Sequence, residues 1–169
     1  MLPKKIEDAI NGQINKELFS EYLYLSMATY FAAEGLSGFE NFFIVQAQEE
    51  RFHAMKFYHF INERGGRVLL KKLNDPKTDF ASIEEVFKLS LDHERFISKS
   101  IYELMDLAIE EKEHATKSFL NWFIDEQVEE EASMQAILDK LKLIGGKGQG
   151  LLMLNTELAA RVYTPPVAV

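Results

Sequence analysis

The chain has no cysteine and only one tryptophan. It also lacks any uninterrupted apolar run long enough to cross a membrane. Without cysteine it can form no disulfide, no thiolate zinc site and no cysteine-ligated iron–sulfur cluster. The first residues, Met1 to Lys5, do not form the apolar stretch of a secretory signal peptide. We therefore expect a cytoplasmic protein with no membrane partner, and the absence of cysteine fits that compartment.

Positive charge is scarce, because 19 lysine and arginine residues stand against 27 aspartate and glutamate residues, for a formal net charge of -8. A nucleic-acid-binding surface would be basic, so we expect no nucleic-acid partner. Hydrophobic residues make up 47% of the chain, and 13 residues are phenylalanine. A chain of 169 residues can bury a sizeable core. We predict one domain, covering residues 1–169, with an aromatic-rich interior.

Helical periodicity predicts an all-α protein with four long helices and one short one. Glycines lie where three of the long helices should end, and Ser82 with Glu85 forms a capping box where the third should begin. Nothing marks the end of the third helix, which we place from its length alone. The expected helices cover residues 4–34, 38–64, 83–111, 114–143 and 148–161.

The connections between these helices predict how they are arranged. The first and third connections are short and favour antiparallel pairs, whereas residues 67–81 have no helical period and can cross the length of a bundle. We therefore predict a four-helix bundle at 3–144 with one long crossover connection. A short fifth C-terminal helix and a tail follow at 147–169.

Each long helix carries an apolar stripe at three- and four-residue spacing, and a carboxylate interrupts each stripe near its middle. These carboxylates are Glu17, Glu50, Glu94 and Glu130, and His53 lies one turn after Glu50. The midpoints of antiparallel helices lie at one height, so the five side chains should meet. A buried carboxylate is costly unless something compensates it. Four of them around an imidazole indicate a site for a multivalent cation.

The residue types narrow the choice of metal. Glu50-x-x-His53 places a carboxylate and an imidazole on one helical face, and the fourth helix offers Gln127-x-x-Glu130. Oxygen ligands with one imidazole suit iron or manganese, and zinc could bind there without redox chemistry. A single buried glutamate more often has a structural role, so the prediction depends on all four together. Tyr24, one heptad after the first glutamate, is either a core tyrosine or a hydrogen-bonding or redox partner of the centre.

Other residues of the same types are expected at the surface. A second Glu-x-x-His, formed by Glu111 and His114, lies among charged residues at a helix end. Glu131 lies next to the stripe rather than in it. His59 and His93 lie off the ligand stripes and are also expected to be exposed.

Several motifs spread along the chain extend this pattern. They are Tyr22–Ala28 (YLYLSMA), Gln46–Glu50 (QAQEE), His53–Met55 (HAM), Glu63–Gly66 (ERGG) and Glu126–Glu131 (EQVEEE). Together they resemble the ferritins, specifically the haem-free type of bacteria and archaea, over nearly the whole chain. The resemblance implies a ferritin-like bundle and no haem, because Arg51 stands where haem-binding relatives carry methionine.

The resemblance also implies a diiron ferroxidase centre. Glu17, Glu50 and His53 would hold one iron. Glu50, Glu94 and Glu130 would hold the second. Gln127 would lie close by, and Tyr24 and Trp122 would lie beside the centre. The implied catalytic residues are Glu17, Tyr24, Glu50, His53, Glu94, Gln127 and Glu130. A third iron site would use Glu49, Glu126, Glu129 and Glu130.

The function predicted from this resemblance is that of an iron-storage ferritin. It would oxidise Fe(II) with dioxygen or peroxide and store ferric mineral inside a 24-subunit homo-oligomeric cage. The short fifth helix, with its apolar run from Leu151 to Leu154, would pack against other copies. One alternative is a diiron oxidoreductase of the peroxidase or oxygenase type that acts on a substrate other than iron. Another is a structural cage or metal-buffering protein that binds iron without oxidising it.

Overall fold

The computed structural model describes residues 2–165. Met1 and the end of the predicted tail, residues 166–169, lie outside this part. The elements are α1 (Lys4–Ala33), α2 (Ser37–Glu63), α3 (Ile83–Glu110), α4 (His114–Ile144) and α5 (Gly148–Ala159). The predicted all-α class is confirmed, and each predicted boundary lies within two residues of the observed one. Within the described residues, no helix has both the length and the apolar character that crossing a membrane requires.

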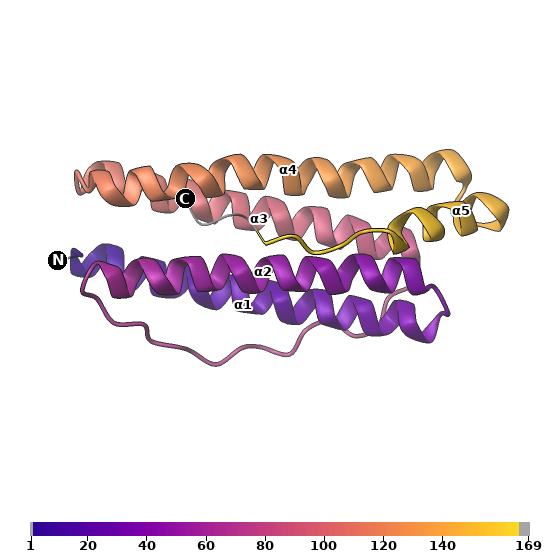
Figure 1. The fold of residues 1–169 in the computed structure, drawn as a ribbon, viewed down its shortest axis with the longest axis horizontal. Helices are drawn as coiled ribbons and strands as arrows, with labels where there is room; N and C mark the ends of the chain where they lie inside the picture. Colours follow the sequence, from indigo (N-terminus) through magenta and orange to yellow (C-terminus); the bar gives the residue numbers. More distant parts are fainter. Residues whose placement is uncertain (1, 166–169) are drawn as a thin grey trace.

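The four long helices form a bundle with a single crossover (Figure 1). α1 and α2 are antiparallel, as are α3 and α4. The irregular connection from Arg64 to Ser82 runs the length of the bundle along its outside and links the first pair to the second. The start of α3 is fixed by Ser82, whose hydroxyl accepts a hydrogen bond of 3.1 Å from the backbone N–H of Glu85. The long crossover makes α2 and α3 parallel, and the predicted single-crossover bundle is confirmed.

The turn between α3 and α4 is made without glycine or proline. Lys112 takes a left-handed conformation with φ of 53°, which is uncommon for a residue with a side chain. Glu113 then caps α4, since its carboxylate accepts a hydrogen bond of 2.8 Å from the N–H of Thr116. A lysine in a left-handed turn has no sequence signature, which is why length alone located this boundary.

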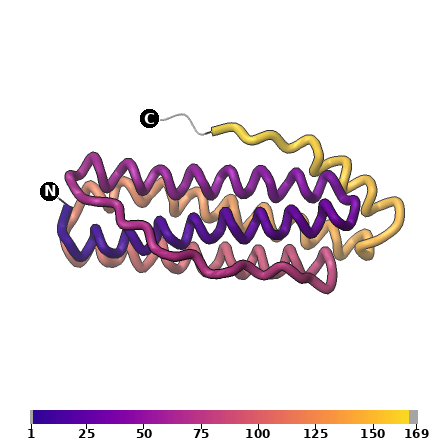
Figure 2. The backbone as a smooth tube through the Cα atoms, turned by 90° about the horizontal axis from the view of Figure 1, so that it is seen from below, coloured from indigo at the N-terminus to yellow at the C-terminus, as the bar shows by residue number. Residues whose placement is uncertain are grey.

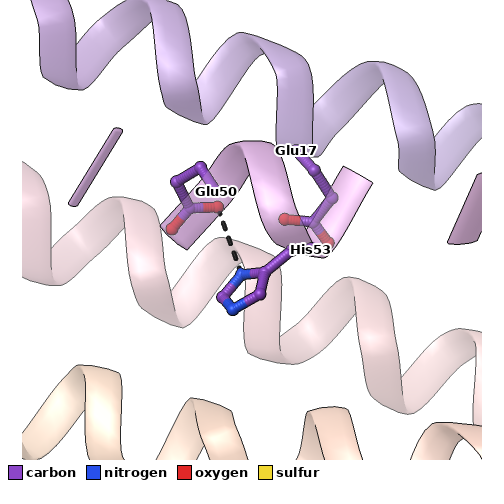
Figure 3. Close-up of side chains that lie close together, drawn as sticks. All are labelled: Glu17, Glu50 and His53. Carbon is purple, nitrogen blue, oxygen red and sulfur yellow. Dashed lines mark ion pairs between the residues drawn. The ribbon is translucent and has the colours of Figure 1, made fainter. Parts of the chain in front are cut away.

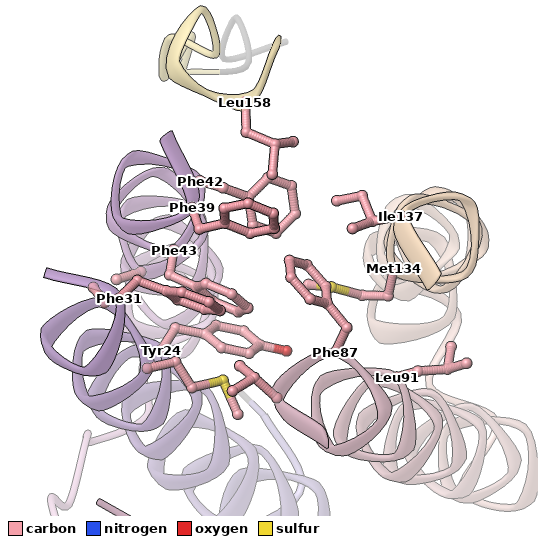
Figure 4. Close-up of a cluster of buried hydrophobic side chains, with 14 of the residues drawn as sticks. Tyr24, Phe31, Phe39, Phe42, Phe43, Phe87, Leu91, Met134, Ile137 and Leu158 are labelled. Carbon is pink, nitrogen blue, oxygen red and sulfur yellow. The ribbon is translucent and has the colours of Figure 1, made fainter. Parts of the chain in front are cut away.

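The core consists of two separate apolar clusters, one in each half of the bundle. The cluster near α5 is rich in aromatic rings (Figure 4), and Phe31 stacks on Phe43 with ring centroids 5.5 Å apart. The cluster in the other half includes Phe57 stacked on Phe123 at 4.1 Å. The predicted aromatic-rich interior is confirmed, and the layer between the clusters is polar.

α5 is partly buried within its own chain. Leu154 and Leu158 are buried against the bundle, whereas Leu152 and Met153 remain 62% and 68% exposed. Asn155 fastens the helix to the start of α2, because its Oδ1 atom accepts a hydrogen bond of 2.9 Å from the N–H of Gly38. Only part of the apolar face of this helix is therefore left for other copies.

Gly38 lies so close to α5 that a side chain cannot fit. A Cβ atom added there would lie 1.7 Å from the carbonyl oxygen of Asn155. We expect Gly38→Ala to displace α5 and to destabilise the protein by about 1–3 kcal/mol, the usual cost of overpacking. Gly12→Ala is the control, since nothing lies within 4 Å of that site, and alanine should be neutral or stabilising in a helix. Thermal unfolding of both variants tests this, and equal Tm values would contradict it.

Candidate metal centre

The predicted ligands lie in the polar layer between the two apolar clusters. α1 contributes Glu17, α2 contributes Glu50 and His53, α3 contributes Glu94, and α4 contributes Glu130. All five side chains are buried, with exposed fractions between 0 and 5%. Four buried carboxylates in one layer carry a high energetic cost unless protons or cations compensate their charge.

The first close group joins α1 and α2 (Figure 3). Ligand atoms of Glu17, Glu50 and His53 all lie within 4.8 Å of one another. Within the group, Nδ1 of His53 is 3.6 Å from Oε2 of Glu50. Gln13, one turn before Glu17, orients it by donating a hydrogen bond of 2.8 Å from Nε2 to Oε1. Two carboxylates and an imidazole at this separation can share one divalent cation.

The second close group joins α2 and α4 and uses the other side of the same imidazole. Ligand atoms of His53, Glu126 and Glu130 lie within 4.8 Å of one another, and Nε2 of His53 is 3.8 Å from Oε1 of Glu126. Gln46 donates a hydrogen bond of 2.9 Å from Nε2 to Oε2 of Glu130. His53 therefore lies between two sets of carboxylates.

Glu94 is held by hydrogen bonds from two other predicted site residues. The hydroxyl of Tyr24 donates to Oε1 of Glu94, and Nε2 of Gln127 donates to Oε2 at 3.1 Å. Tyr24 is fully buried in the apolar cluster near α5 and also contacts Glu94 through its hydroxyl, so both features predicted for it, core packing and hydrogen bonding, are present. Both oxygens of Glu94 are engaged in this structure, and it belongs to neither close group.

Two carboxylate oxygens in this layer lack hydrogen-bond partners. Oε2 of Glu17 and Oε2 of Glu50 are buried, and neither accepts a hydrogen bond from any described residue. An ionised carboxylate can only accept, and leaving it unpaired in the interior is costly. A cation between these two oxygens would remove that cost, so the residues present fit a bound metal ion.

Burial changes how these groups titrate. Burial raises the pKa of Glu94 to about 8, with a further rise from the charge of Glu130. It also raises the pKa of Glu17 and, helped by the neighbouring charge of Glu94, raises that of Glu50 well above its usual value. Burial alone would lower the pKa of His53, but the carboxylates of Glu126 and Glu50 beside its two ring nitrogens raise it well above its usual value. The metal-free centre therefore holds protons that a cation would displace.

These shifts predict that the metal-free protein becomes less stable as the pH rises. A raised carboxyl pKa means that the folded state binds more protons than the unfolded state between about pH 5 and 8, so stability falls across that range. The raised pKa of His53 acts in the same direction. We expect the Tm to fall by about 5–10 °C. Saturating Zn²⁺ should abolish the fall, because metal binding tightens as the ligands lose protons. A metal-free Tm that rises over this range would contradict the prediction.

The predicted ligands Glu49 and Glu129 are less buried than the five in the polar layer. Glu49 is half-buried and pairs with Arg161, whose Nη2 atom is 2.6 Å from Oε2 of Glu49. Glu129 is exposed and belongs to neither close group among the described residues. Trp122 lies beside the centre, with its ring centroid 5.5 Å from that of His53.

The predicted exposure of His93 is wrong. The side chain is mostly buried, its Nε2 atom is 2.8 Å from the hydroxyl of Ser20, and burial lowers its pKa to about 4. His93 lies off the ligand stripe of α3, but the face of the helix that carries it packs against Phe19 and Tyr24 of α1 rather than facing solvent. By contrast, His59 and the Glu111/His114 pair are exposed, as predicted.

Gln13 and Gln46 donate hydrogen bonds to the predicted ligands Glu17 and Glu130, a role that was not predicted from the sequence. Each lies four residues before a predicted ligand, Glu17 and Glu50 respectively. In a helix that spacing places two side chains on the same face. This signal could have found both glutamines.

The chain forms a single-crossover helix bundle with four buried carboxylates and one imidazole between its two apolar clusters. These features are typical of the helix bundles that bind metal ions in their core. The family model for the ferritin-like domain matches residues 7–144 of this chain. The chain belongs to the ferritin family, and the predicted resemblance is confirmed.

Individual relatives agree over almost the full length. The bacterial non-heme ferritin of Staphylococcus aureus (strain USA300) is 44% identical over 163 residues, which cover 96% of this chain and 98% of the relative. The corresponding protein of Staphylococcus epidermidis is 46% identical over the same length. Among solved structures, an open-pore ferritin of the archaeon Archaeoglobus fulgidus superposes with a TM-score of 0.94 at 47% identity, covering 96% of this chain and all of that one. An engineered closed form of the same ferritin gives a TM-score of 0.96.

Proposed function

We propose that this protein is an iron-storage ferritin that oxidises Fe(II) at the centre described above and stores the ferric product inside a 24-subunit cage. The single observation that carries the proposal is a pair of buried carboxylate oxygens, on Glu17 and Glu50, that accept no hydrogen bond and lie beside His53. Membership of the ferritin family supports it, as does the similarity to ferritins described as having open and closed forms. The alternative of an oxidoreductase with a non-iron substrate is not favoured, because the matched relatives are ferritins.

In this proposal, Fe(II) is the substrate. Glu17, Glu50 and His53 bind one ion, and Glu50, Glu94 and Glu130 bind the second. Two ions held together deliver two electrons, which with two protons reduce dioxygen to hydrogen peroxide, or hydrogen peroxide to two waters. Each iron gains one positive charge, and carboxylates in a buried layer stabilise that charge more strongly than water would.

The roles of the other residues follow from their contacts. Tyr24 and Gln127 hold the carboxylate of Glu94 by hydrogen bonds, so that it is oriented before iron arrives. Gln13 does the same for Glu17. Such supporting hydrogen bonds matter because a metal site depends on the orientation of its ligands.

A single preparation tests the proposal. Metal-free protein is mixed anaerobically with two Fe(II) per subunit and then exposed to dioxygen, while ferric absorbance and oxygen consumption are recorded. Light scattering before and after loading measures the mass of the assembly. We expect oxidation at least about 100-fold faster than in buffer and a particle of 24 subunits. Binding without faster oxidation would instead support the metal-buffering alternative, and a monomer would contradict the cage.

The proposed third iron site gives a further prediction. Glu49 and Glu126 immediately precede Glu50 and Gln127 in the chain and are only partly buried. Replacing both with glutamine should leave two tightly bound irons per subunit and remove the third, because amides are weaker ligands than carboxylates. Anaerobic titration followed by calorimetry measures the stoichiometry.

The matched control is the double variant Glu63→Gln, Asp125→Asn, which removes two exposed carboxylates from the same helices. It should keep the parent's stoichiometry. Three tight sites in the Glu49/Glu126 variant would remove these two residues from the assignment.

A further inference from the structure

The described residues after α5 return to the candidate centre. They run back along α2 (Figure 2), and Tyr163 lines a cavity on that helix together with Arg51 and Phe52. The return is anchored at its start, because Nδ2 of Asn41 donates hydrogen bonds to the carbonyl oxygens of Leu158, at 3.1 Å, and Arg161, at 2.9 Å. The C-terminal segment is thus held against the part of α2 that carries the proposed ligands.

Arg161 is a residue of this segment that contacts a proposed ligand. Its Nη2 atom donates a hydrogen bond of 2.6 Å to Oε2 of Glu49. Its guanidinium lies over the ring of Phe42, 4.5 Å from the centroid, an arrangement that fixes the cation in place. The exposed fractions of the Arg161 and Glu49 side chains are 25% and 23%, so water screens the pair only partly.

The other guanidinium nitrogen is not satisfied in this position. Nη1 of Arg161 is buried and donates no hydrogen bond to any described residue. A buried donor without an acceptor destabilises the arrangement. The hydrogen bond to Glu49 and the contact with Phe42 therefore hold the guanidinium in this position. If another cation binds Glu49, the hydrogen bond is lost and Arg161 can move away.

We infer that Arg161 is a tethered competitor for the third iron: its guanidinium occupies the Glu49 arm of that site and lowers the site's affinity. The inference rests on the proposed function, which assigns Glu49 to the site. Arginine is always charged, so the guanidinium can compete whenever Glu49 is ionised. A third iron that binds must take the Glu49 oxygen from Arg161, and its departure restores the ion pair. The site is then suited to passing iron on rather than holding it.

Calorimetric titration of the metal-free, assembled protein with Zn²⁺, which is redox-inactive, tests this without measuring oxidation. We expect Arg161→Gln to tighten the third Zn²⁺ site by about tenfold and to leave the first two sites within twofold. The matched control is Arg64→Gln, which breaks an ion pair of 2.9 Å with Glu113 at the other end of the bundle. It should change none of the three sites.

A double-variant cycle separates competition from a general effect of charge. In a Glu49→Gln background, Arg161→Gln should have no further effect on Zn²⁺ binding, because the contested carboxylate is gone. An equal gain in that background would overturn the inference, as would an unchanged third site in Arg161→Gln alone. Hydrogen exchange of the unmodified protein gives a second measure. Amides of residues 159–165 should exchange faster when the third Zn²⁺ is added, and unchanged exchange would count against displacement. A protein that binds no Zn²⁺ at the first two sites would instead overturn the proposed function.

Discussion

Replacing Glu50 by alanine is expected to slow rapid Fe(II) oxidation by at least about 100-fold while leaving the helices intact. Glu50 is assigned to both irons, so its loss weakens both sites together. Its side chain is also part of the first close group, with Glu17 and His53. Stopped-flow absorbance after addition of two Fe(II) per subunit measures the rate, and circular dichroism measures the helical content.

The stability of the metal-free variant serves as its control. Removing one of several buried carboxylates reduces their mutual repulsion, so Tm should equal or exceed that of the parent when no metal is present. With Zn²⁺ added, the parent should gain more stability than the variant, because stabilisation by a ligand follows its affinity for the folded state. Oxidation at the parent's initial rate would remove Glu50 from the centre.

The second large effect should distinguish two adjacent glutamates on α4. Glu130 is buried and is hydrogen-bonded by Gln46, whereas Glu131 is partly exposed and accepts a hydrogen bond of 2.5 Å from the hydroxyl of Ser98. One residue along a helix rotates the side chain by about 100°. Glu130→Ala should therefore slow oxidation by about tenfold or more, and Glu131→Ala should change it by less than about twofold.

Both alanine variants carry the same loss of charge, so each is the control for the other. Their initial oxidation rates are compared at equal iron loading, together with the number of Zn²⁺ ions bound per subunit. Glu131→Ala should keep the parent's number of tight sites. Equal losses in the two variants would mean that the face of α4 assigned to the centre is wrong.

Periodicity predicted the fold and the buried layer well, because both depend on regular features of helices. The spacing of apolar residues indicates which face of a helix is buried, and helices of similar length place their midpoints at one height. These two regularities were enough to predict that Glu17, Glu50 and His53 lie close together. It also separated Glu130 from Glu131, which differ clearly in burial.

Contacts between segments far apart in the sequence could not be predicted in the same way. The pairing of Arg161 with Glu49 spans 112 residues and depends on how the chain leaves α5. His93 has the spacing of an exposed residue, yet a neighbouring helix covers it. The left-handed Lys112 lies in a turn closed by a hydrogen bond of 2.8 Å from the N–H of Glu113 to the carbonyl oxygen of Ala108, and lysine does not mark such a turn in the sequence. Periodicity encodes neither tertiary packing nor a turn of this kind.

The division of the apolar core has a consequence for how the protein unfolds. Each half of the bundle contains its own apolar cluster, and each cluster draws residues from all four long helices. The polar layer between them belongs to neither cluster, and hydrogen bonds among buried side chains join the helices there. Without metal, the charges of the buried carboxylates weaken this layer relative to the two clusters. We expect the two halves to open as separate cooperative units. In the metal-free protein, backbone amides at mid-helix should then exchange faster than amides within either apolar cluster. Metal binding would then join the two units into one.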